Sequence, residues 1–152
     1  GGTLKKVRSF LTRLPLRTVR TMTASTFAAW LDKETLVMKV PWGVARKCLN
    51  IFLRDAFYNR YLCKEYGLRR LEKWLEAPLD SIVAQFLIEN DRGPGTGVWP
   101  GLKWLKAKKN RAFQEVATEV AAREGTARVH LDILVWPNRR KANAKTGRKA
   151  KR

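Results

Sequence analysis

The stretch from Val44 to Cys63 constrains the fold most, because its apolar residues recur every three or four positions. This spacing places them along one face of an α-helix. Pro41 and Gly43 precede the stretch and Gly67 follows it, and such residues are typical of helix boundaries. The sequence therefore predicts one long amphipathic helix that ends at Gly67.

The other apolar segments show similar spacing and are interrupted by proline and glycine. Asp80 or Ser81 is a candidate N-cap for one of them, and the glycine-rich stretch 93–97 is expected to be a loop. The last segment fits a strand or a helix by periodicity alone, and we interpret it as a helix from its neighbours. We predict an all-α fold with one packed core and helices near residues 25–37, 68–75, 81–87, 102–105, 113–122 and 129–136.

Charge divides the chain of 152 residues into three parts. There are 32 basic and 13 acidic residues, a net charge of +19, and both ends lack acids. Residues 1–21 hold six basic residues and residues 139–152 hold eight, which leaves 18 basic and 13 acidic residues for 22–138. We predict a helical domain over 22–138 between two basic, disordered termini. Residues 1–21 are a transit-like peptide, a basic arm or an upstream extension, and residues 139–152 are a solvated end or a binding arm.

This charge favours nucleic acid as the partner, because basic side chains that meet phosphates release condensed counterions. DNA is the expected partner and RNA the alternative. The chain lacks a run of about 18 apolar residues, so we expect no membrane span. Cys48 and Cys63 fit no disulfide framework, and His130 is the single histidine. We therefore expect an intracellular, cytoplasmic or nucleoid-associated monomer without a metal or other cofactor.

The segment from Val40 to Leu53 holds the candidate site. Gly43 stands at the predicted helix start, and Arg46 and Lys47 follow within its first turns. Free backbone amides and the helix dipole favour an anion there, although cations at a helix start oppose the dipole. A bound phosphate would explain these cations, so Gly43, Val44, Ala45 and Arg46 are candidate phosphate-binding residues.

The run Gly43-Val44-Ala45-Arg46-Lys47, with Asn50 after it, resembles the hairpin of the helix-hairpin-helix DNA glycosylase/lyase superfamily. The spacing from Lys47 to Asp80 is most similar to the archaeal 8-oxoguanine DNA glycosylase branch, and so is the ending Val129–Trp136. The resemblance covers about 95 residues, from roughly Val40 to Trp136. Ala45 replaces the second hairpin glycine of the family, and the helices that precede the family's hairpin are largely missing.

The resemblance implies a helix-hairpin-helix fold and a base-excision-repair enzyme that acts on damaged or abasic DNA. Lys47 would be the nucleophile that forms a Schiff base with the sugar, and Asp80 would be the catalytic aspartate. Apart from the resemblance, His130 and Asp132 are candidates for residues that contact this pair from the next layer outward. Such an enzyme turns the damaged base out of the stack before it cuts the glycosidic bond.

Simpler interpretations remain open for the same residues. Lys47 fits an ordinary phosphate contact, Asp80 fits an ordinary N-cap, and His130 and Asp132 fit polar groups at the edge of the core. The alternative function is a non-catalytic helical protein that binds nucleic acid. It would bind through the helical domain with uniform affinity for different sequences, or bind RNA through the basic tails.

Overall fold

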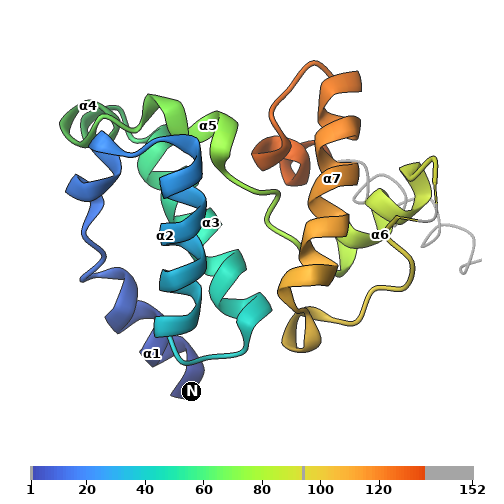
Figure 1. Ribbon diagram of the computed structural model, residues 1–152, viewed down its shortest axis with the longest axis horizontal. Helices are drawn as coiled ribbons and strands as arrows, with labels where there is room; N and C mark the ends of the chain where they lie inside the picture. Colours follow the sequence, from blue (N-terminus) through green and yellow to red (C-terminus); the bar gives the residue numbers. More distant parts are fainter. Residues whose placement is uncertain (1, 94, 136–152) are drawn as a thin grey trace, which may run out of the picture.

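The computed structural model describes residues 2–93 and 95–135, and these residues are mostly helical with no strand among them. The helices form two groups (Figure 1): α1 to α5 lie on one side of the molecule, and α6 and α7 lie on the other. The all-α prediction is therefore confirmed at this level. The longer helices are α1 (Gly2–Leu11), α2 (Ala24–Val37), α3 (Trp42–Tyr58), α6 (Ser81–Asn90) and α7 (Ala107–Arg123). The shorter ones are α4 (Arg60–Tyr66), α5 (Leu71–Trp74) and the 3-10 helices η1 (Leu16–Thr21), η2 (Leu68–Arg70), η3 (Leu102–Trp104) and η4 (Arg128–His130).

Two clusters of buried apolar side chains correspond to the two groups of helices. The first cluster is built around Leu31, Leu49 and Leu53, where α2 and α3 pack together. The second is built around Leu87 and Phe113, where α6 packs against α7. Sequence patterning predicted a single core, whereas the structure has two clusters: the buried apolar side chains of α3 belong to the first, and Trp42 at its start packs against the second.

The N-terminal segment differs from the expected disordered arm. This segment consists of α1, a connection over 12–15 and η1, and its apolar residues Val7, Leu14 and Val19 belong to the first core cluster. The physical reason is amphipathicity: these buried residues face the core while the basic residues of α1 stay exposed. The predicted tail, residues 139–152, lies outside the described residues.

The helix expected from Val44 to Gly67 is two helices, so that prediction was wrong in its middle. α3 ends at Tyr58, and the side chain of Asn59 accepts hydrogen bonds from the amides of Tyr61 and Leu62 at the start of α4. An asparagine in this position competes with continuous helix by capping a new one. Gly67 ends α4 in the left-handed conformation, as predicted, with φ of 64°.

A four-residue connection, 38–41, joins α2 to α3, and the two helices pack against each other. Lys39 takes the left-handed conformation in this connection, with φ of 53°. Gly43 instead lies within the first turn of α3. Its role is close approach, because a Cβ atom there would lie 2.3 Å from the carbonyl oxygen of Leu102.

The segment expected to form the last helix is helical as far as it is described, with η4 followed by a helical turn over 131–135. The predicted helix at 113–122 starts earlier, at Ala107, and the segment 102–105 contains the 3-10 helix η3. No helix among residues 2–93 and 95–135 has the length and apolar character needed to cross a membrane.

Candidate active site

The structure brings Lys47 and Asp80 together although 33 residues separate them in the chain. Lys47 lies in the second turn of α3, and Asp80 is the N-cap of α6. The distance from Lys47 Nζ to Asp80 Oδ2 is 3.1 Å, and the two side chains are 22% and 21% exposed. The pair is therefore mostly shielded, but part of each side chain remains accessible to solvent.

The two oxygens of Asp80 have different partners. Oδ1 accepts hydrogen bonds from the backbone amides of Ile82 and Val83, each at 2.9 Å, while Oδ2 contacts Lys47. The cap fixes the carboxylate at the positive end of the α6 dipole and leaves one oxygen to serve the lysine. Capping and a chemical role are thus compatible in the same side chain.

The segment that leads to Asp80 is held from both sides. Ala77 and Leu79 are buried in the second core cluster. The side-chain amide of Gln114, on α7, accepts a hydrogen bond from the Ala77 amide and donates one to the Ala77 carbonyl. These contacts fix the entry to α6, so the position of Asp80 relative to α3 is set by packing.

Arg46 directly precedes Lys47 in α3, but its side chain faces the interior. Its Nε and Nη2 donate to the two carboxylate oxygens of Glu76 at 2.8 and 2.7 Å, and Nη1 donates to Asp32 at 2.8 Å. The Arg46 side chain is 9% exposed and that of Glu76 is 12% exposed. Arg46 was predicted to bind phosphate; in this arrangement its guanidinium is occupied by carboxylates and is turned away from solvent.

Two asparagines complete the surroundings of Glu76. Asn50 accepts a hydrogen bond from the Glu76 amide, and Asn110 donates to the Glu76 carboxylate at 3.1 Å. Burial disfavours charge on Glu76, but the hydrogen bond and the positive charge of Arg46 outweigh it. They hold the pKa of the Glu76 carboxyl below its ordinary value. The pKa of Arg46 is raised, because the attraction of Glu76 and Asp32 exceeds the effect of its burial.

The backbone predicted to hold a phosphate is partly covered. Gly43 and Ala45 are buried, and Leu102 and Leu105 lie directly against Gly43. The Ala45 amide donates to the Pro41 carbonyl, which is the first hydrogen bond of α3. Val44 is half-buried. The amides of the first turn that precede Ala45 have no partner within the helix, but η3 covers one side of this turn.

His130 and Asp132 contact α3 about two turns beyond Lys47, on the same face of the helix. Asp132 accepts a hydrogen bond from Arg54 at 2.6 Å. His130 contacts the Tyr58 hydroxyl through Nδ1 and Glu72 through Nε2. Their side-chain partners are therefore Arg54, Tyr58 and Glu72, and the predicted support of Lys47 and Asp80 stays a prediction.

One oxygen of Asp132 has no hydrogen-bond partner in the part of the chain that the structure describes. Asp132 Oδ1 is buried and receives no hydrogen bond from the described residues. Burial also raises the pKa of Tyr58, and the positive charge of Arg54 opposes that shift. Sequence reasoning missed Arg54, although its position seven residues after Lys47 places the two side chains on one helix face. It also missed Glu76, which carries no local signal because its partner lies 30 residues away.

Residues 2–93 and 95–135 contain no candidate metal site, since no three His, Cys, Asp or Glu side chains gather there.

Comparison of the chain with known protein families, curated proteins and solved structures gave no match.

Proposed function

We propose that the protein is a helix-hairpin-helix DNA glycosylase with AP lyase activity, in which Lys47 is the nucleophile and Asp80 the catalytic carboxylate. The observation that carries the proposal is the contact between Lys47 Nζ and Asp80 Oδ2 at 3.1 Å. A primary amine becomes a nucleophile only after it loses a proton to solvent, and a fixed carboxylate at hydrogen-bond distance holds the amine in place while keeping its own negative charge. The net charge of +19 supports a polyanionic substrate.

The chemistry follows from these two groups. Lys47 Nζ attacks the sugar C1′ while the glycosidic bond breaks, and the departing base takes the bonding electron pair. The proton released by the amine goes to Asp80 or to the base. The negative charge of Asp80 faces the positive charge that develops on the sugar, and this stabilises the transition state.

The covalent adduct then explains strand cleavage. The sugar ring opens, its oxygen takes up a proton, and an iminium ion forms between Lys47 and C1′. Loss of a proton from C2′ expels the 3′ phosphate, and water later hydrolyses the iminium to free the lysine. Each step uses only the substrate, the two side chains and water, so the proposed reaction requires no cofactor.

Borohydride trapping tests the proposal, because it reduces the iminium to a stable amine. Duplexes that carry an abasic site or 8-oxoguanine would be incubated with the protein, with Lys47→Met and with Lys5→Met. Lys5 is an exposed lysine of α1 and controls for the loss of one positive charge. We expect a covalent band for the wild type and Lys5→Met and none for Lys47→Met.

The absence of a band with the wild type on both substrates would reject the lyase activity on them. Binding that is nevertheless tight and sensitive to salt would favour the alternative, a non-catalytic protein that binds nucleic acid.

A further inference from the structure

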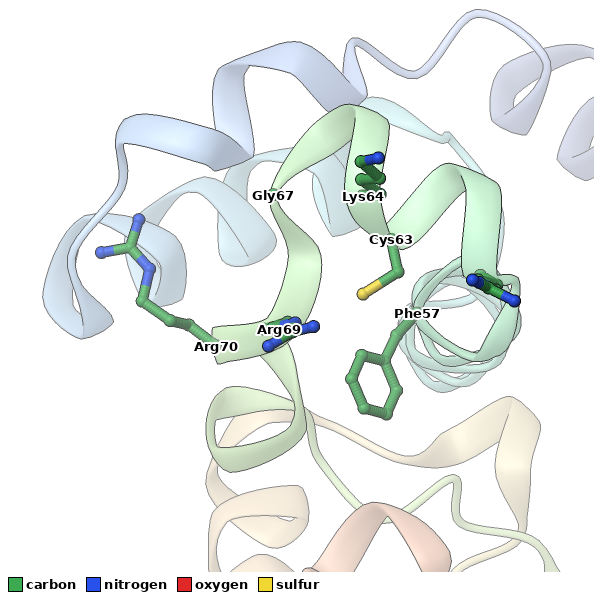
Figure 2. A pocket seen from close by; sticks show the side chains of 7 residues that line it. Phe57, Cys63, Lys64, Gly67, Arg69 and Arg70 are labelled. Carbon is green, nitrogen blue, oxygen red and sulfur yellow. The ribbon is translucent and has the colours of Figure 1, made fainter.

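Four basic side chains surround a cavity of about 750 Å³ where the end of α3 meets α4 and η2. We call it the basic pocket. Its lining contains no acidic residue and consists of Phe57, Arg60, Cys63, Lys64, Gly67, Arg69 and Arg70. Figure 2 shows that the Cys63 sulfur and the Phe57 ring are turned to the same side, toward Arg69. The pocket thus has an apolar wall and a cationic rim.

The four cations of the basic pocket are not neutralised by the protein. Among the described residues, none of them lies within ion-pair distance of a carboxylate. All four basic side chains are exposed, and Arg70 also donates to the Arg20 carbonyl and places its guanidinium over the Trp74 ring. By contrast, Arg46, Lys47 and Arg54 on the neighbouring helix each contact a carboxylate. Unneutralised cations around one hollow repel each other and attract a bound anion.

The local fold brings these cations together. Gly67 ends α4 in the left-handed conformation, and the chain reverses there so that Arg69 returns beside Lys64. A side chain at Gly67 would be strained at φ of 64° and would also press against Arg20. The turn at Gly67 therefore determines the shape of the basic pocket.

The position of the basic pocket relates it to the proposed active site. Phe57 follows Lys47 by ten residues on α3, which corresponds to about 15 Å along the helix axis. Successive base pairs of a duplex are about 3.4 Å apart, so this distance spans roughly four to five base pairs. A duplex whose axis runs parallel to α3, with its lesion at Lys47, would reach the pocket with its phosphodiester backbone, because that backbone winds around the duplex axis just as Phe57 is turned by about 80° around α3 from Lys47.

We infer that the basic pocket is a second DNA-binding site, which holds the phosphodiester backbone about four to five nucleotides from the nucleotide at Lys47. This inference rests on the proposed function, because the distance is counted from the nucleotide that reacts with Lys47. Lys64 and Arg69 neutralise phosphates, and the Phe57 ring packs against the sugar. The pocket therefore sets the length of DNA that the protein needs for tight binding.

The test uses the full chain and a fluorescent duplex that contains a reduced abasic analogue, which is bound but not cleaved. The pocket variant is Lys64→Glu/Arg69→Glu, and the control is Lys5→Glu/Lys6→Glu, which changes the net charge equally on exposed positions of α1. Affinity would be measured between 50 and about 200 mM salt, the range over which phosphate contacts are lost. Circular dichroism would verify that both variants are folded, and Lys64→Gln/Arg69→Gln replaces the pocket variant if it is not.

We expect the pocket variant to bind at least tenfold more weakly than the control, with its salt slope reduced by about 2 because two phosphate contacts are lost. Wild-type affinity should also fall when the DNA flanks are shortened below four nucleotides, and the pocket variant should be insensitive to that shortening. Equal weakening of the two variants, or the same flank dependence in both, would overturn the inference.

Borohydride trapping separates this result from the proposed function. If the wild type forms an adduct and the pocket variant binds like the control, the basic pocket is rejected and the lyase stands. If the wild type forms no adduct but the pocket variant alone loses affinity and flank dependence, the pocket stands as a DNA site and the lyase is rejected.

Discussion

Arg46 and Lys47 are neighbours on α3, but they lie in two different environments. Arg46 is buried and donates to Glu76, Asp32 and Thr35. Lys47 is partly exposed and contacts Asp80. Successive helical residues differ by about 100° in direction, so two adjacent cations can face the core and the solvent respectively. The Arg46–Glu76 pair is buried and stabilises the fold, whereas the Lys47–Asp80 pair is accessible enough to react with a ligand. Each prediction below changes one of these two pairs.

The largest effect is expected from Lys47→Met, which removes the proposed nucleophile. The covalent adduct with abasic DNA should disappear completely, because methionine cannot form an iminium ion. The free energy of unfolding should change by less than about 1 kcal/mol, since the lost ion pair is partly exposed to solvent. Trapping and urea denaturation measure the two quantities, and an adduct of undiminished yield would contradict the assignment.

Arg46→Met should have the opposite effect to Lys47→Met: it should lower the stability of the fold but leave the nucleophile in place. It leaves the Glu76 carboxylate in a mostly buried position without its main partner, which we expect to lower the free energy of unfolding by about 3–5 kcal/mol. Urea denaturation at neutral pH measures this loss, and Lys47→Met serves as the matched control. The double variant Arg46→Met/Glu76→Met should recover part of the loss, because it removes the unpaired charge. A loss below about 1 kcal/mol would mean that the pair is not structural.

Two substitutions of Asp80 separate its cap from its charge. Asp80→Ala should lower the free energy of unfolding by about 0.5–2 kcal/mol, because the α6 amides lose their acceptor. Asp80→Asn should keep most of that stability, yet both variants should form the adduct more slowly, since neither carries the carboxylate charge. The rates of trapping and the denaturation midpoints are compared, and full activity of Asp80→Asn would limit Asp80 to capping.

The smallest expected effect concerns acid stability. The folded protein lowers the pKa of Glu76, chiefly because Arg46 outweighs the penalty of burial, so its carboxylate stabilises the fold at neutral pH. This contribution is present above the ordinary pKa of about 4.5 and is lost as the pH falls through the lowered folded value. Denaturation curves between pH 7 and pH 3 should therefore show a decline below pH 4.5 that is weaker in Glu76→Gln. An identical decline in both proteins would assign it to other carboxylates.

Local sequence signals predicted the helices well and the side-chain partners only in part. Apolar spacing with Pro41 and Gly67 indicated where helices occur, and Asp80 was recognised as a cap because that signal lies within a few residues. The break at Asn59 was missed, since apolar spacing continues across it. The helical N-terminus was missed as well, because the basic residues of α1 outweighed its few apolar ones in the composition.

The residues of the candidate site were also predicted only where the signal is local in the sequence. The resemblance to the glycosylase hairpin singled out Lys47 and Asp80, and the structure places these two in contact. The burial of Arg46 was not predictable, because it depends on Glu76 and Asp32, which approach α3 from other segments. A motif defines the order of side chains along a helix, whereas the neighbouring segments decide which of them stay available to a ligand.

The most direct test of the account is to identify the residue that carries the trapped DNA. The wild-type adduct with an abasic duplex would be reduced, digested with a protease and a nuclease, and analysed by mass spectrometry. We expect the sugar fragment to be attached to Lys47, in a peptide that the Lys47→Met protein yields unmodified. Attachment to other lysines, such as the exposed Lys64 or Lys73, with Lys47 unmodified, would contradict it and show that the site formed by Lys47 and Asp80 is not the reactive one.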